Sequence, residues 1–242
     1  MTVNLTINPP RSMVVKLSGH LSTPSHVELI AEYANIIREL WVRGVRLSVV
    51  VGGGDTAREY ISAARTLGGD ETTLDRIGAM VARLNAMLLI SALPVIAYPK
   101  PPENLEEFLE AHATGKIVVS GGFQPGQSTT AVSALIAESM RADILVNLTT
   151  VDAVYTEDPA VKPGAKPLTK ITISELEEIL MKNIDYRAGK YKLMDPLSIM
   201  IVKRSGIPLV IADGRKPENL IKIAEGRIPG TLVVPDIESE DR

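Results

Sequence analysis

Short apolar runs alternate with longer amphipathic segments along most of the chain. The runs are rich in β-branched residues, and each is followed by Gly, Thr or Asp before a segment with helical periodicity, which is typical of buried strands. Strands are therefore expected at residues 13–17, 47–51, 116–120, 144–148, 208–212 and 231–234, with 94–97 as a further candidate.

The segments between these runs repeat their apolar residues at the helical period. They predict helices at residues 27–43, 56–67, 74–92, 103–112, 129–141, 173–181, 196–205 and 218–225. Near-continuous apolar strands that alternate with helices indicate a mainly parallel sheet covered on both faces. The pattern predicts an α/β sandwich.

The chain of 242 residues is 45% hydrophobic and only 4% aromatic, which fits one large domain or two intimate lobes with aliphatic cores. Residues 156–169 are rich in Pro, Lys and Gly, and they are the best candidate for a long surface loop or a lobe boundary. Residues 236–242 form an acidic tail.

Charge and composition exclude several classes of function. The net charge of −3 gives no overall electrostatic case for nucleic acid or a membrane surface, and the absence of cysteine excludes disulfides, thiolate nucleophiles and Cys-ligated metals. The three histidines show no metal-binding spacing, so no protein metal site is expected. The start of the chain lacks the pattern of a signal peptide, and no apolar stretch approaches the roughly 18 residues that span a bilayer, so we expect a cytoplasmic protein.

Four turns follow predicted strands and precede polar or helical segments. We name them the first turn (residues 16–20), the second turn (52–58), the third turn (121–130) and the fourth turn (149–159). In open α/β sheets, ligands collect beyond the carboxyl ends of the strands, where helix N-termini favour anions. The turns therefore predict phosphate binding at one edge of the sheet.

The first two turns carry the cations. Lys16 brings a point charge suited to a phosphate oxygen, although a strand lysine can also reach solvent at an ordinary turn. The second turn reads GGGDTAR, and three successive glycines are costly unless the backbone adopts unusual angles or touches a ligand. Arg58 is expected in the first turn of the next helix, where a bound anion would offset its unfavourable interaction with the helix dipole. A structural turn with a surface arginine is the alternative.

The third turn, GGFQPGQSTT, could hydrogen-bond a base or sugar, and the alternative is a surface loop in which Ser128 caps the next helix. The fourth turn places hydroxyls, carboxylates and Tyr155 beyond a strand, and the alternative is a polar turn. Neither a GxGxxG nor a GxxxxGK[ST] motif is present.

The motifs KLSG, VVVGGGDTAR, LDRIGAM, SGGFQPGQSTT, TTVDAVYTEDP and MDPLSIMIVKRSGI occur in this order. Together they resemble the amino-acid-kinase superfamily and, within it, the archaeal type of uridylate kinase. The resemblance implies a single three-layer α/β/α sandwich, with an acceptor-binding part at about 13–140 and an ATP-binding part at about 141–235. It also implies a cytoplasmic homohexamer, which is a trimer of dimers. This enzyme would use Mg²⁺ to transfer the γ-phosphoryl group of ATP reversibly to UMP. The resemblance places the reaction in pyrimidine nucleotide biosynthesis, under feedback by UTP.

The resemblance also assigns residues, with Lys16 and Arg58 as the catalytic cations. It implies an ATP site made of Lys16, Ser18, Gly19, His20, Gly53, Arg58, Thr149, Thr150, Tyr155 and Asp158. It implies a UMP site made of Gly52, Asp75, Phe123, Gln124, Pro125, Gly126, Gln127, Ser128 and Thr129, in which Asp75 contacts the ribose. Phosphoryl transfer needs positioned cations and N–H donors more than a general base, which agrees with this set.

Two residues depart from the pattern. Thr130 stands where relatives often carry an Asp that organises the catalytic lysine, and Ala153 replaces a glycine in the fourth turn, at a cost of about 1 kcal/mol if a positive φ is required there. Alternatives within the superfamily are isopentenyl phosphate kinase, acetylglutamate kinase and aspartokinase. Isopentenyl phosphate kinases carry a histidine after the second turn that this chain lacks, and aspartokinases add regulatory domains. A non-catalytic nucleotide sensor on the same fold is the remaining alternative.

Overall fold

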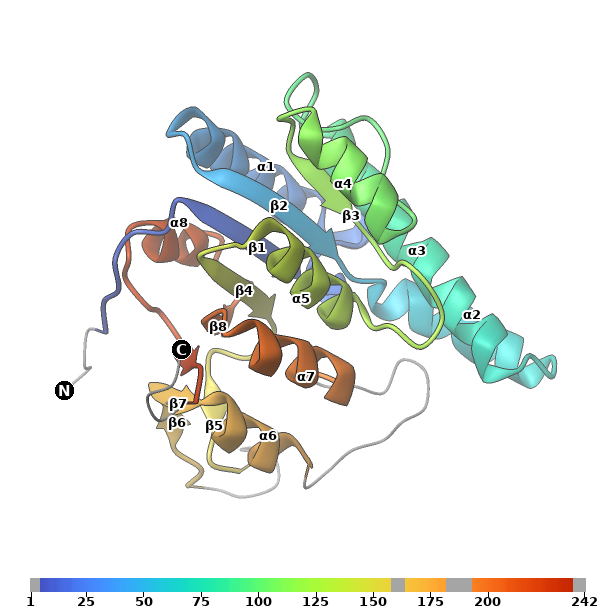
Figure 1. Ribbon diagram of the computed structural model, residues 1–242. Coiled ribbons are helices and arrows are strands. Elements are labelled where there is room, and N and C mark those ends of the chain that lie inside the picture. Colours follow the sequence, from blue (N-terminus) through green and yellow to red (C-terminus); the bar gives the residue numbers. More distant parts are fainter. Residues whose placement is uncertain (1–4, 158–163, 182–192, 237–242) are drawn as a thin grey trace.

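The core of the protein is a mainly parallel sheet in which one pair of neighbouring strands is antiparallel (Figure 1). The computed structural model describes residues 5–157, 164–181 and 193–236. Within these ranges a seven-stranded sheet has the order β3-β2-β1-β4-β8-β9-β7, and all neighbours are parallel except β8 and β9. Its strands are β1 (Ser12–Leu17), β2 (Arg46–Val51), β3 (Val118–Ser120), β4 (Ile144–Thr149), β7 (Lys170–Thr172), β8 (Leu209–Asp213) and β9 (Thr231–Val234).

All eight predicted helices are present, with ends that shift by a few residues. They are α1 (Val27–Val42), α2 (Gly54–Thr66), α3 (Glu71–Ser91), α4 (Leu105–Ala113), α5 (Thr129–Met140), α6 (Ile173–Met181), α7 (Pro196–Ser205) and α8 (Glu218–Ala224). The largest shift is at α3, which begins at Glu71 rather than at residue 74. The Asp70 side chain caps this helix by accepting a hydrogen bond from the Thr73 N–H, so the first turn forms without an apolar residue.

Two apolar layers cover the sheet, as the alternating strands require. Alternate residues of β1 point to opposite faces: Met13 and Val15 pack with α1, α3 and α8, whereas Val14 packs with α4, α5, α6 and α7. The fold is thus a three-layer α/β/α sandwich, and the predicted fold class is confirmed. In Figure 1, α2 and the start of α3 extend beyond the sheet as a helical hairpin. Within the described ranges, no helix combines the length and apolar character that crossing a membrane requires.

The short strands were not predictable from periodicity. The candidate strand at 94–97 is reduced to a single bridge between Ala97 and Ile117. The predicted loop at 156–169 is wrong at its far end, because β6 (Pro167–Leu168) pairs antiparallel with β5 (Val154–Tyr155) to form a separate ribbon. Strands of two residues are too short to show an alternating pattern.

Candidate functional site

The four turns meet at one edge of the sheet. Strands β1, β2, β3 and β4 are mutually parallel neighbours, so their carboxyl ends lie on the same side. The first turn follows β1, the second follows β2, the third follows β3 and the fourth follows β4. The structure therefore brings the predicted turns together as the parallel pattern required.

The first and second turns touch backbone to backbone. A Cβ atom added to Gly19 would lie 2.0 Å from the Gly54 nitrogen and 2.7 Å from the Gly52 carbonyl carbon. Gly54 itself has a φ of 64°, which L-residues rarely adopt. The glycines thus allow the two turns to approach each other closely, and this contact fixes the distance between the end of β1, which carries Lys16, and the start of α2, which carries Arg58.

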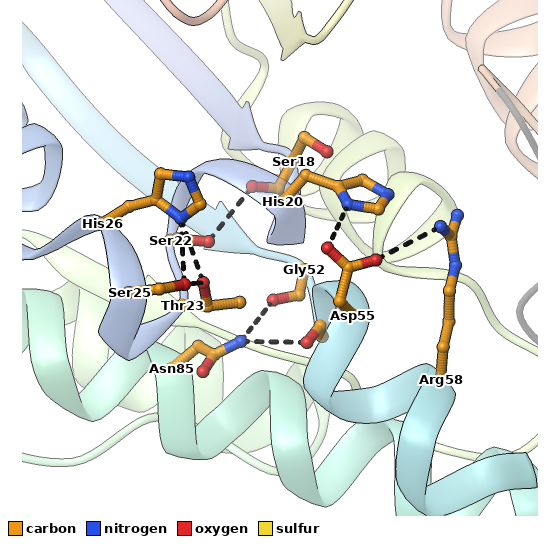
Figure 2. Close-up of polar contacts among 11 residues, drawn as sticks. Ser18, His20, Ser22, Thr23, Ser25, His26, Gly52, Asp55, Arg58 and Asn85 are labelled. Atoms are coloured by element: carbon orange, nitrogen blue, oxygen red, sulfur yellow. Dashed lines mark hydrogen bonds and ion pairs between the residues drawn. The ribbon is translucent and has the colours of Figure 1, made fainter.

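Asn85 in α3 holds the second turn from below (Figure 2). Its buried side-chain amide donates to the Gly52 carbonyl at 3.0 Å and to the Gly53 carbonyl at 3.2 Å. Both carbonyl oxygens are therefore directed toward α3, and the N–H groups at the start of α2 remain without intrahelical partners, as in any helix. Sequence reasoning missed Asn85, although a lone amide in the apolar stretch LNAMLL is a visible signal.

Asp55 links the two turns on their exposed side. Its carboxylate lies 3.0 Å from His20 Nδ1 and 3.5 Å from an Arg58 guanidinium nitrogen, as Figure 2 shows. The expected place of Arg58 is wrong, because α2 begins at Gly54 and puts Asp55 in its first turn and Arg58 in its second. The acid that complements the helix dipole is Asp55, and Arg58 is an exposed cation with one carboxylate beside it.

Lys16 is the half-buried cation of the site. Burial lowers the pKa of its ammonium from 10.5 to about 8, and the negative charge of Asp195 opposes that shift. A lysine with this pKa is charged at neutral pH and loses its proton under mildly alkaline conditions. Its strand position points it at the face covered by α5 and α7, beside Val50.

Asp195 joins two helix N-termini beneath Lys16. Its carboxylate accepts a hydrogen bond from the Ser128 hydroxyl and another, at 3.1 Å, from the Ser198 N–H, which caps α7. The Ser128 hydroxyl oxygen in turn accepts from the Ala131 N–H at 3.0 Å and caps α5. The helix cap that was the alternative for Ser128 is thus present. Asp195 belongs to the motif MDPLSIMIVKRSGI but was given no role from the sequence, although Asp-Pro before a helical segment is a capping signal.

The third turn lies against the start of α3. The Asp75 carboxylate accepts a hydrogen bond from the Gly126 N–H at 2.8 Å. Phe123 is buried, Gln124, Pro125 and Gly126 are exposed, and Gln127, Ser128 and Thr129 are half-buried. Gly121 and Gly122 do not expose their backbone to a ligand as their sequence suggests, because added Cβ atoms would clash with the α3 backbone at Arg83 and Ala79.

The fourth turn lies between β4 and β8. The Thr149 carbonyl accepts from the Gly214 N–H at 2.7 Å, Thr150 is exposed, and the Tyr155 hydroxyl donates to Asp152 at 3.0 Å. Ala153 does not have a positive φ, so the backbone cost considered for it is not incurred. Asp158 lies outside the described residues.

A pair that sequence reasoning missed closes this side of the site. The Arg215 guanidinium donates to both carboxylate oxygens of Asp213, at 2.8 and 3.0 Å, which lowers the pKa of Asp213 and raises that of Arg215. Asp213 ends β8 and Arg215 follows it, and neither residue carried a motif in the sequence.

The order of the turns and the lysine of the first turn match a known family. The sequence profile of the amino acid kinase family covers residues 11–213. The chain belongs to the amino acid kinase family. It is 46% identical over 225 residues to a uridylate kinase of Hyperthermus butylicus, with 93% of this chain and 99% of the relative covered. It is also 46% identical over 226 residues to a uridylate kinase of Methanothermobacter thermautotrophicus, at 93% and 99% coverage.

Among solved structures of the family, the uridylate kinase from Archaeoglobus fulgidus superposes with a TM-score of 0.81 at 39% identity and covers 92% of this chain and 99% of that chain. A UMP kinase from Bacillus anthracis has a TM-score of 0.76 at 22% identity, with 95% of this chain and 98% of that chain covered, which shows the shared fold. The proposed resemblance to the archaeal type of uridylate kinase is thereby confirmed.

Proposed function

We propose that this protein is a uridylate kinase that transfers the γ-phosphoryl group of ATP reversibly to UMP, giving ADP and UDP. The observation that carries the proposal is Lys16, a half-buried lysine of lowered pKa near the carboxyl end of β1, the strand whose turn packs directly against the turn that follows β2. The identity of 46% to uridylate kinases over nearly the whole chain supports UMP as the acceptor.

Two parts of the edge divide between the nucleotides in this proposal. UMP lies over the N-terminal part, about 13–140, with Gly52, Asp75 and the residues of the third turn. The hydrogen bond between Asp75 and Gly126 supports this, because the carboxylate proposed for the ribose lies beside the turn proposed for the base. ATP lies over the part at about 141–235, and its phosphates reach the first and second turns.

The donor site proposed for ATP combines backbone and side chains. Lys16, Ser18, Gly19, His20, Gly53 and Arg58 are assigned to the phosphates, and Thr149, Thr150, Tyr155 and Asp158 to the adenosine. The free N–H groups of the α2 N-terminus favour an anion at this place. Lys16 stabilises charge on the transferring group, and its desolvation makes that interaction stronger than in water.

Mg²⁺ enters the proposal as part of the donor, MgATP. Among the described residues, no group of three or more His, Asp or Glu side chains converges as a metal site. Isolated carboxylates and hydroxyls suit an ion that takes most of its oxygen ligands from phosphates and water.

An acceptor panel tests the proposal. ADP release is measured with MgATP and UMP, CMP, dTMP, isopentenyl phosphate or acetylglutamate, because the superfamily shares this scaffold among acceptors. Isopentenyl phosphate is included because the fold brings His20 against the second turn, although no histidine lies close after that turn in the sequence. Turnover with UMP is expected, and turnover with a non-nucleotide acceptor alone would contradict the proposal. Tight binding of UMP or UTP without any turnover would favour the sensor.

We further propose that the protein works in the cytoplasm, in pyrimidine nucleotide synthesis, as a homohexamer built from dimers, with UTP as a feedback ligand. The exposed apolar stripe of Met80, Leu84 and Met87 along α3 supports a contact between copies. A Leu84→Lys variant is expected to reduce the mass measured by light scattering. The matched control is Leu109→Lys on α4, an exposed leucine outside the stripe, and equal mass loss in both variants would contradict this contact.

A further inference from the structure

Asn147 lies beside Lys16 in the centre of the sheet. In the parallel pairing of β1 and β4, Asn147 is the direct partner of Lys16. Partner residues on neighbouring strands lie about 5 Å apart and point to the same face. That face is covered by α5 and α7, and Lys16 is half-buried there.

Only one of the two polar atoms of the Asn147 side-chain amide has a hydrogen-bond partner among the described residues. Its nitrogen donates to the Leu193 carbonyl at 3.3 Å, whereas its oxygen has no hydrogen-bond partner among the described residues. The side chain is 1% exposed, so water does not reach this oxygen freely. A buried acceptor without a donor is rare, and the ammonium of the adjacent Lys16 is a group that can donate to this oxygen.

Few charged groups surround Lys16, so a neutral acceptor is needed beside it. Asp195 is the one described group whose charge raises the pKa of Lys16. The strands on either side carry no charge near it, α5 above it has none before Glu138, and Asp55 and Arg58 lie on the exposed side of the second turn. Thr130, at the position where the resemblance expected an acid, is neutral.

We propose that Asn147 is a positioning residue for Lys16. The side-chain oxygen of Asn147 accepts a hydrogen bond from the Lys16 ammonium while the γ-phosphoryl group is transferred. The side-chain nitrogen of Asn147 donates to the Leu193 carbonyl and so holds the segment before α7, in which Leu193 lies two residues from Asp195. Asn147 thus fixes both the lysine and the segment that carries its counter-charge. This inference rests on the proposed phosphoryl transfer.

Asn147→Leu and Asn147→Asp test the proposal. Leucine removes the acceptor, so kcat is expected to fall about 10- to 100-fold while KM for UMP stays within about threefold, since the bond matters for transfer rather than for acceptor binding. Aspartate keeps an acceptor, so its kcat is expected to exceed that of the leucine variant. Ser48→Ala is the matched control, because Ser48 on the same face of β2 also has a buried, unpartnered oxygen but is not adjacent to Lys16.

The titration of Lys16, followed by NMR of ¹³C-labelled lysines, separates this inference from the function. Leucine is expected to lower the pKa of Lys16 and aspartate to raise it, and Ser48→Ala to leave it unchanged. An unchanged Lys16 titration in the aspartate variant, or equal kcat losses in Asn147→Leu and Ser48→Ala, would overturn the proposal. Failure of the wild-type protein to phosphorylate UMP would instead contradict the proposed function, and the Lys16 titration would still decide the role of Asn147.

Discussion

Replacing Gly19 by alanine is expected to separate the first and second turns. The new Cβ would lie 2.0 Å from the Gly54 nitrogen and 2.6 Å from its Cα, whereas ordinary contacts begin near 3.4 Å. Both atoms belong to the backbone, so no side chain can rotate away, and one turn must move by about 1.4 Å. A misplacement of about 1 Å in an active site can cost about 100-fold in rate. We therefore expect kcat for UMP phosphorylation to fall about 100-fold.

The assay is coupled ADP release at saturating MgATP and UMP, with thermal unfolding followed by circular dichroism to show that the variant is folded. Gly44→Ala is the matched control, because Gly44 has a φ of 82° and nothing lies within 4 Å of an added Cβ. It should lose stability, by about 1 kcal/mol, without losing kcat. A folded Gly19→Ala enzyme with kcat within about threefold of the wild type would refute the reasoning that this contact sets the geometry.

Three further predictions concern the groups around that contact. Lys16→Met should lower kcat by about 100-fold or more and change KM for UMP little, which steady-state kinetics checks, and unchanged turnover would remove Lys16 from the mechanism. Asn85→Leu removes two hydrogen bonds and leaves the Gly52 carbonyl without a donor, whereas the Gly53 carbonyl keeps the Ala57 N–H, so the free energy of unfolding should fall by about 2 kcal/mol and kcat should fall with it; an unaffected melting curve would contradict this. Asp195→Asn removes the charge that raises the pKa of Lys16, so the loss of kcat/KM at alkaline pH, expected near pH 8 in the wild type, should begin at lower pH; a limb that stays in place or moves to higher pH would contradict the assignment.

The architecture was predictable because the main strands and helices obey simple periodicities. Runs such as 47–51 are apolar throughout and end at glycine, and they became strands at almost the predicted residues. Once these strands are parallel, their turns must share an edge, so the gathering of Lys16, Arg58 and the third turn also followed from the pattern. What periodicity could not give was the ribbon of β5 and β6, whose two-residue strands carry no repeat.

The internal chemistry of the site was less accessible. The triple glycine was expected to meet a ligand, and the structure adds that Gly54 meets Gly19, a contact between residues far apart in sequence. Asn85, Asp195 and Asn147 act on the site from a helix interior, a helix cap and a strand interior. Each was a lone polar residue in an apolar stretch or at a helix start, and its partner is defined only by the tertiary fold.

The central claim is that this edge of the sheet moves a phosphoryl group from ATP to UMP. Phosphorus NMR of the protein with MgATP and UMP observes that transfer directly, with Lys16→Met as the background. We predict that the resonances of UMP and of the ATP γ-phosphate disappear together as those of UDP and ADP grow. ATP consumption that yields inorganic phosphate, with the UMP resonance unchanged, would contradict the claim.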